Sequence, residues 1–323
     1  MLERKLRKDE REKLLKTLIK DPSIKEVRHL EDLVKLYEQI WGFSAADLVR
    51  ASEIITDMIK DKNCVKFFSF TGNLVSTGFR GLIKDIIKEG FIDVIITTCG
   101  SIDHDIARTA GGGYFRGTFD IDDKYLEDLE IHRLGNVFIP LENYGPVIEK
   151  TVYKVLSKLD KERHYGVREI VDSIGDELGN EDSFIYCARK RHVPIYVPGF
   201  LDGAFGTAMF TYSTMNRILI DPFKDQKELA DIVFKAKRSG AIIVGGGISK
   251  HHTIWWNQFK EGLDYAVYIS TAQEFDGSLS GARPREAITW GKIKPQAEYC
   301  FVNGDATIIC PLLLIMVKSL ISI

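Results

Sequence analysis

Six short apolar runs recur along the chain, and they constrain its fold more than any other feature. Each run is rich in β-branched or aromatic residues and does not alternate with polar ones. Strands that are buried on both faces of a parallel sheet have this pattern, because helices cover both faces. The runs are CVKFFSF, DVIITT, VPIYVP, AIIVGGG, YAVYIST and YCFVNG, which begin at Cys64, Asp93, Val193, Ala241, Tyr265 and Tyr299.

Helical patterns separate these runs, so strands and helices are expected to alternate along the chain. The patterns cover Val75–Glu89, Gly145–Leu159, Lys224–Lys237 and Thr253–Glu261. This alternation predicts an α/β fold with a doubly wound, mostly parallel, Rossmann-like sheet. The segment Ala110–Gly135 interrupts the alternation, and we expect it to form a long loop.

No internal repeat, low-complexity tract or Pro/Gly-rich linker divides the 323 residues. We therefore expect one domain, with an N-terminal helical region over 1–60 and a core over 61–323. The first twenty residues are highly charged and carry a partial helical stripe of Leu6, Leu14, Leu15 and Leu18. This favours a charged surface helix; the alternative is an arm that contacts a neighbouring subunit or a partner.

Composition excludes several classes of protein. The formal net charge of -2 argues against a broad nucleic-acid footprint. The most apolar run, Thr307–Val317, is shorter than the roughly 20 residues that span a bilayer, so we expect a buried or interface helix. The first residues lack an apolar signal core, which favours the cytoplasm. The cysteines form no C-x-x-C pair, so neither a disulfide framework nor a cysteine zinc site is expected, and no metal is predicted.

Glycine and small polar residues follow the apolar runs. Ligands of open parallel sheets bind outside the carboxyl ends of the strands, where glycine lets a backbone approach a phosphate. A dinucleotide would suit such a crevice, although the G-x-G-x-x-G fingerprint is missing. The pattern predicts a crevice for a polar ligand without choosing that ligand. The residues concerned are Gly72, Asn73, Thr98, Gly100, Asp202, Gly203, Gly246, Gly247, Asp276 and Asp305.

Two residues in the last third of the chain have two interpretations each. Lys292 follows a short helix expected over Arg285–Trp290 and ended by Gly291. It is either a solvated cation at the helix terminus or an amine desolvated against an aromatic face, which could act as a nucleophile. His251 either caps a helix start or accepts a proton near neutral pH. The sequence alone favours the solvated cation and the cap.

Six segments together resemble the deoxyhypusine synthase family, and its archaeal more than its eukaryotic branch. They are TGNLVSTG, TTCGSIDHD, VPGFLDGAFG, GGGISKHH, YAVYISTAQEFDGSLSGARPREAITWGK and GDA, in the family's order and spacing. The resemblance implies NAD-dependent transfer of the aminobutyl group of spermidine, through an imine on an enzyme lysine, to a lysine of the translation initiation factor five-A precursor. It also implies a homotetramer with active sites shared between paired subunits.

The resemblance also assigns roles to residues. It implies that Lys292 forms the imine and that His251 accepts a proton. Trp290 would supply an apolar wall and a face for an amine cation. The implied cofactor residues are Gly72, Asn73, Leu74, Val75, Ser76, Thr98, Cys99, Gly100, His104, Asp202, Gly246, Thr271, Ala272, Asp305 and Ala306. The implied substrate residues are Asp103, Tyr268, Gly277, Ser278, Glu286 and Trp290.

Four positions depart from the eukaryotic pattern of this family. His104 stands in place of a glutamate, Thr207 and Leu279 in place of aspartates, and Trp255 in place of an asparagine. A site with fewer carboxylates should hold a trication less tightly unless Asp103, Asp105 or Asp276 compensates. The donor could then be spermidine, agmatine or another amine, although the departures are also expected of the archaeal branch.

Rival functions differ in their acceptor or lack catalysis. A homospermidine synthase would use the same imine with a small diamine acceptor, and a scaffold would bind NAD without turnover. A sirtuin-like deacylase would need paired zinc cysteines, which the sequence lacks. For a basic protein acceptor we expect an acidic rim near Lys292. The acidic cluster Asp120–Glu130 is a candidate, and a solvated acidic face is the favoured alternative.

Overall fold

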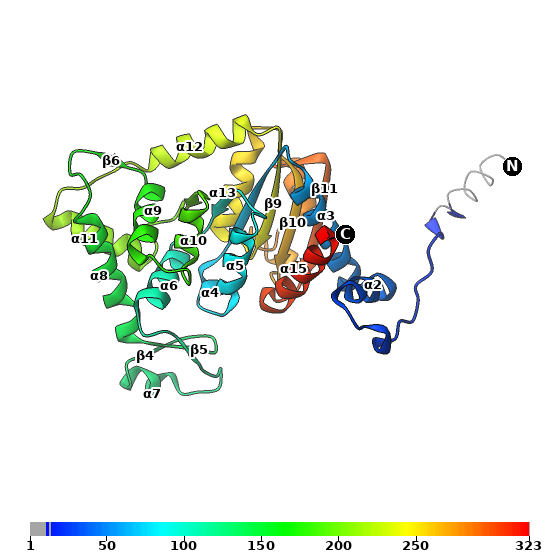
Figure 1. Ribbon diagram of the computed structural model, residues 1–323, viewed down its shortest axis with the longest axis horizontal. Coiled ribbons are helices and arrows are strands. Elements are labelled where there is room, and N and C mark those ends of the chain that lie inside the picture. Colours follow the sequence, from blue (N-terminus) through cyan, green and yellow to red (C-terminus); the bar gives the residue numbers. More distant parts are fainter. Residues whose placement is uncertain (1–10, 13, 323) are drawn as a thin grey trace.

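A six-stranded parallel sheet forms the centre of the protein in a computed structural model, which describes residues 11–12 and 14–322 (Figure 1). The strand order is β11-β10-β9-β1-β2-β7. Every predicted run supplies one strand, which confirms the doubly wound α/β fold. The strands are β1 (Cys64–Phe70), β2 (Val94–Ile96), β7 (Ile195–Tyr196), β9 (Arg238–Val244), β10 (Leu263–Ser270) and β11 (Ile293–Asn303).

Both faces of the sheet are buried, as the unbroken apolar runs predict. Neighbouring residues of β1 separate into two cores, with Phe67 on one face and Phe68 on the other. The first core contains α13 (Gly247–Gln258), α12 (Pro222–Lys235) and α14 (Pro284–Thr289). The second contains α2 (Leu30–Ile40), α3 (Ser44–Lys60), α5 (Phe79–Lys88) and α15 (Ala306–Ser322).

Five helices extend the second core beyond the β7 edge of the sheet, at the left of Figure 1. The short strands β6 (His164–Tyr165) and β8 (Leu219–Ile220) pair in parallel beside them. Short 3-10 helices occur at Ile24–Glu26, Leu141–Asn143 and Glu274–Asp276. The five helices are α6 (Cys99–Ala110), α8 (Gly145–Leu156), α9 (Val167–Leu178), α10 (Phe184–Lys190) and α11 (Ala204–Met215).

The segment Ala110–Gly135 is not a loop, which corrects the expectation from sequence. It contains β3 (Phe115–Arg116), α7 (Asp123–Asp128) and β4 (Ile131–Leu134), and β5 (Val137–Pro140) completes a three-stranded antiparallel sheet. Gly135 has a φ of 61° in the tight β4–β5 turn, which favours glycine. The acidic cluster lies here on and around α7, at the end of the molecule opposite β11 (Figure 1).

Three predicted helix boundaries are wrong. The helix expected over the first twenty residues does not continue beyond residue 14; Leu15 and Leu18 are exposed, and Leu6 lies outside the described residues. The helix expected over 75–89 is α5, which begins at Phe79; Val75 instead ends a separate short helix, α4 (Gly72–Val75). The helix expected from Thr253 begins at Gly247 instead.

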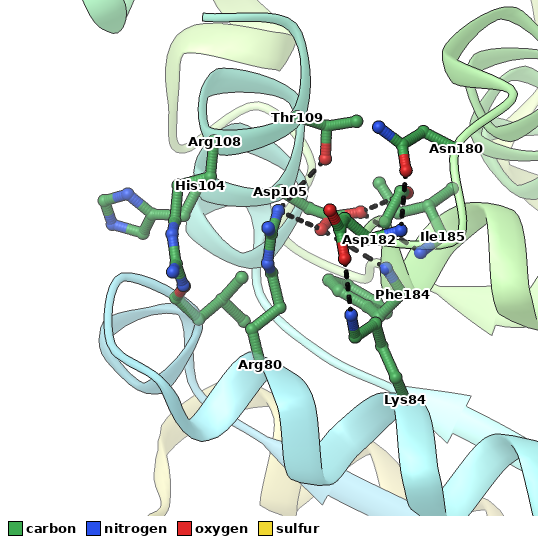
Figure 2. Close-up of polar contacts among 12 residues, drawn as sticks. Arg80, Lys84, His104, Asp105, Arg108, Thr109, Asn180, Asp182, Phe184 and Ile185 are labelled. Carbon is green, nitrogen blue, oxygen red and sulfur yellow. Dashed lines mark hydrogen bonds and ion pairs between the residues drawn. The ribbon is translucent and has the colours of Figure 1, made fainter. Parts of the chain in front are cut away.

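A buried ion pair ties α5, α6 and α10 together (Figure 2). Asp105 of α6 is fully buried, and its Oδ1 accepts from Nη1 of Arg80 at 3.2 Å. Its Oδ2 accepts from the Ser183 hydroxyl at 2.5 Å and from the Ile185 N–H at 3.1 Å. Asp105 therefore caps the first turn of α10 and neutralises Arg80, and it cannot reach an amine ligand as the sequence analysis had allowed.

In the described part of the chain, no helix is long and apolar enough to cross a membrane. Over the same residues, no group of three or more His, Cys, Asp or Glu side chains is placed to hold a metal ion. The five cysteines are free and buried.

Candidate active site

A cavity of about 390 Å³ lies between α13, β10, the segment after β10 and α14. Residues that are distant in sequence meet there because α13 and α14 cover the same face of the sheet. Both candidate catalytic residues and five of the six candidate substrate residues line this cavity. They are Lys292, His251, Tyr268, Gly277, Ser278, Glu286 and Trp290.

The end of α14 directs Lys292 into the cavity. Gly291 has a φ of 65°, which reverses the chain, and the Lys292 N–H then donates to the Ala287 carbonyl at 2.9 Å. Lys292 is only 8% exposed. Its Nζ lies 5.3 Å from the Trp290 ring centroid and 5.7 Å from that of Trp255. Burial lowers the pKa of the Lys292 amine, and the charge of Glu286 partly opposes this. Lys292 is thus a desolvated amine rather than a solvated cation.

His251 lies within α13 rather than at its start, so it does not cap the helix. Its imidazole stacks on the Trp255 indole, with ring centroids 5.5 Å apart and an interplanar angle of 29°. Burial, and then the nearby charge of Lys292, lower the pKa of His251. A neutral imidazole can accept a proton, which is the role that the family resemblance implies for His251.

Lys250 is a cavity residue that the sequence analysis missed. It is buried, and its Nζ donates to the carbonyls of Leu279 and Ala282, both at 2.7 Å. The ammonium also lies 4.5 Å from the Tyr268 ring centroid. Burial lowers the pKa of Lys250 to about 8. Lys250 therefore holds the loop after β10 against α13, and no local sequence signal separates it from a solvated lysine.

Two glycines allow close packing here: Gly246 brings this loop against the start of α13, and Gly281 lets the loop fold back on its own residue Gln273. A Cβ at Gly246 would lie 2.5 Å from the Ser280 Cα, and one at Gly281 would lie 1.8 Å from the Gln273 carbonyl oxygen. The Ser280 hydroxyl also accepts from the Gly247 N–H at 3.1 Å. The glycines thus permit the close packing that forms one wall of the cavity.

Few carboxylates line the cavity. Glu274 pairs with Arg285 at 2.6 Å, whereas the described residues place no ion pair on Glu286. Leu279 lines the wall without charge, as its departure from the eukaryotic pattern implies. Asp276 is exposed, and its Oδ1 accepts from the Ser278 N–H at 2.6 Å. Glu286 is therefore the carboxylate best placed for an amine ligand.

Asp103, the sixth candidate substrate residue, is not among the residues that line this cavity. Its carboxylate accepts from the Phe205 N–H at 2.7 Å, the Ala204 N–H at 3.1 Å and the Tyr144 hydroxyl at 3.3 Å. Asp103 therefore caps the N-terminus of α11. Burial raises its pKa to about 6.

A second candidate region lies at the carboxyl ends of β1 and β9, where the order of the strands reverses. Gly245 has a φ of 89°, and a Cβ there would lie 3.0 Å from the Thr71 Oγ1. Beside it, the Gly72 N–H donates to the Thr98 hydroxyl at 3.0 Å. The first turns of α4 and α6 thus meet at the switch point, where open α/β sheets bind ligands.

The remaining candidate cofactor residues have mixed surroundings. Ser76 lines a neighbouring hollow of about 850 Å³, together with Thr307. Asp202 is exposed, whereas the Asp305 Oδ1 accepts from the Thr307 N–H at 2.7 Å and so caps α15. His104 is buried with its Nδ1 2.9 Å from the Tyr114 hydroxyl, and burial lowers its pKa to about 4.

A pair of glycine substitutions tests this close approach. In Gly72→Ala the new Cβ would lie 2.7 Å from the Gly100 carbonyl carbon, so α4 and α6 must separate. We expect a loss of about 1–3 kcal/mol in the free energy of unfolding, measured in urea. The matched control is Gly100→Ala, whose Cβ would meet its nearest atom at 3.8 Å. Equal stabilities of the two variants would contradict the predicted contact.

Comparison with known proteins places this architecture in a family. The sequence pattern of deoxyhypusine synthase matches residues 32–317. A probable deoxyhypusine synthase of Sulfurisphaera tokodaii is 52% identical over 94% of this chain and 97% of its own. One of Ignicoccus hospitalis is 50% identical over 94% and 96%. A crystal structure from Entamoeba histolytica, assigned to the same enzyme, has a TM-score of 0.62 at 18% identity and covers 92% of this chain and 96% of its own.

The doubly wound sheet and the matched sequence pattern define a transferase enzyme of the α/β class. The chain belongs to the deoxyhypusine synthase family, with matches over most of its length.

Proposed function

We propose that the protein transfers the aminobutyl group of spermidine, with NAD as cofactor, to a lysine of the translation initiation factor five-A precursor. The observation that carries the proposal is the Lys292 amine, which is buried beside the Trp290 and Trp255 indoles in the cavity that His251 lines. Membership of the family adds the reaction class.

The residues at the switch point fit a dinucleotide. Glycines at the ends of β1 and β9 let the backbones at Gly72, Gly100 and Gly246 pack closely at this edge of the sheet, where the first turn of α6 begins. The cofactor would bind along this edge. NAD, when bound, would accept a hydride from the donor amine and later return it.

The chain's own residues would carry out the proton and group transfer. His251 would take the proton lost by the donor nitrogen as the donor is oxidised to an imine. The Lys292 Nζ would then attack the imine carbon, and the bond from that carbon to the donor's secondary nitrogen would break, releasing diaminopropane. The result is an aminobutyl imine on Lys292, which the acceptor lysine displaces before reduction.

The pH dependence of donor cleavage follows from these roles. Both His251 and Lys292 must be unprotonated to react. Because burial lowers the pKa of each, the rate should begin to rise at a pH below the pKa of an ordinary lysine. Glu286 raises the pKa of Lys292, so Glu286→Gln should move the acid limb of kcat to lower pH. The check is a pH profile of diaminopropane release; a limb displaced to higher pH would contradict the assignment.

An acceptor assay separates the leading function from its rivals. We would supply spermidine, NAD and either the factor five-A precursor or putrescine. Transfer to the protein supports deoxyhypusine synthase, transfer to putrescine supports a homospermidine synthase, and the absence of turnover with every donor supports an NAD-binding scaffold. Agmatine as an alternative donor tests whether Trp255 and Leu279 have altered the donor site.

The assembly and surroundings of the enzyme remain part of the proposal. We propose a cytoplasmic homotetramer, in which a neighbouring subunit contributes to each active site. The exposed Phe210 and Met215 on α11 would suit burial between subunits. The acidic cluster around α7 lies far from β11 along the molecule, which gives no support to it as a rim of its own subunit's cavity.

A further inference from the structure

Trp255 lies against both groups that would react. It stands one helical turn after His251 on α13, and its indole stacks on that imidazole at 5.5 Å. The same indole lies 5.7 Å from the Lys292 Nζ. Phe259 packs edge-on against it at 5.7 Å, which fixes its orientation. Trp255 is nevertheless 42% exposed and lines the cavity, so part of its side chain is accessible to a ligand.

The cavity lining has few carboxylates that could form ion pairs with a polycation. Lys250, Lys292 and Arg283 line it beside only two acids, Glu274 and Glu286. Glu274 already pairs with Arg285 at 2.6 Å, outside the lining, and with Arg283 of the lining at 3.8 Å. Glu286 is then the single acid of this lining that the described contacts leave for a bound amine. The uncharged surfaces of this lining are the other places where the chain can contact the donor.

Aromatic faces supply such a surface. Trp290, 67% exposed, is a second aromatic side chain beside the Lys292 amine, whose Nζ lies 5.3 Å from its ring centroid and 5.7 Å from that of Trp255. A primary ammonium can bind over an indole face, and the methylenes next to it gain from the apolar contact. An aminobutyl group offers both: a terminal ammonium for the indole face and four carbons for the apolar contact.

We propose that Trp255 determines donor specificity, by binding the aminobutyl end of the donor between its indole and that of Trp290. The inference rests on the proposed function and deepens it. Donors are then selected by a shared aminobutyl end rather than by their total charge. Spermidine and agmatine, which both contain this end, should therefore depend on Trp255 alike.

Binding and kinetics of Trp255 variants test the proposal. For Trp255→Asn we expect about a tenfold weaker Kd for spermidine and for agmatine by calorimetry, and a tenfold higher KM with a smaller change in kcat. Trp255→Phe keeps an aromatic face and should stay within about threefold of the wild type. Phe234→Asn removes an exposed aromatic from α12, outside the cavity, and should leave both constants unchanged.

The outcomes separate this inference from the proposed function. Unchanged donor affinity in folded Trp255→Asn, shown by its thermal unfolding, would overturn the inference even if turnover persists. Loss of affinity on Trp255→Asn with rescue by Trp255→Phe would support it, even if no acceptor were modified and the proposed function failed. A loss of affinity for spermidine alone, with agmatine unaffected, would overturn the claim that both donors bind through a shared aminobutyl end.

Discussion

Lys292→Ala is expected to lower the rate of aminobutyl transfer by on the order of a thousandfold or more, because no amine remains to form the imine. The amine is buried beside the Trp290 and Trp255 indoles, and alanine places no nucleophile there. Lys292→Arg should be equally inactive, since a guanidinium keeps the charge but does not act as a nucleophile. The measurement is spermidine-dependent release of diaminopropane under saturating NAD.

A nearby lysine provides the matched control. Lys294 is two residues away but its Nζ binds Asp264 at 2.9 Å, outside the cavity. Lys294→Ala should retain near wild-type turnover. Substantial activity of Lys292→Ala, with an adduct on Lys250, would mean that the wrong amine has been assigned. Lys250 is the other cavity lysine whose pKa burial lowers, although two carbonyls hold its ammonium in place.

Asp105→Ala is expected to cost about 3–5 kcal/mol in the free energy of unfolding, because it breaks a buried ion pair and leaves the other partner unpaired. Arg80 would lose its counter-ion in the interior, and the Phe184 and Ile185 N–H groups would lose their acceptor (Figure 2). The loss should be general rather than local, since α5, α6 and α10 all meet at this carboxylate. Urea unfolding measures it.

An exposed pair beside this network is the control. Asp182 binds Lys84 at 3.0 Å, but its side chain is 70% exposed. Asp182→Ala should therefore cost less than about 1 kcal/mol. Similar losses for Asp105→Ala and Asp182→Ala would show that the buried network contributes no more than a surface pair.

The strands of the sheet could be predicted from sequence because burial on both faces leaves a local signature. Cys64–Phe70 is apolar without alternation, and it forms β1 as expected. β3 and β4 escaped prediction because strands this short, in an exposed antiparallel sheet, carry little hydrophobic signal. The start of α13 could not be predicted because Gly246 and Gly247 are typical of a loop. In the structure Gly246 packs closely against Ser280, and Gly247 has a φ of 63°.

The candidate site also contains residues that could be predicted and residues that could not. Lys292 of the WGK segment and His251 could both be assigned to one site because the family resemblance implied their roles. Asp103 and Asp105 looked like ligands of an amine, but each caps a helix about eighty to one hundred residues further along the chain. Such partners are set by tertiary structure, so no local pattern could show them. For the same reason Lys250 looked solvated, since its acceptors are carbonyls of the loop after β10.

Imine trapping tests the central claim most directly. The protein would be incubated with NAD and spermidine, reduced with borohydride, and the adduct mapped by mass spectrometry. We expect an aminobutyl group on Lys292, absent without NAD and absent from Lys292→Ala. An adduct on a different residue, or none with spermidine, agmatine or putrescine in protein shown to bind NAD, would contradict transfer through Lys292.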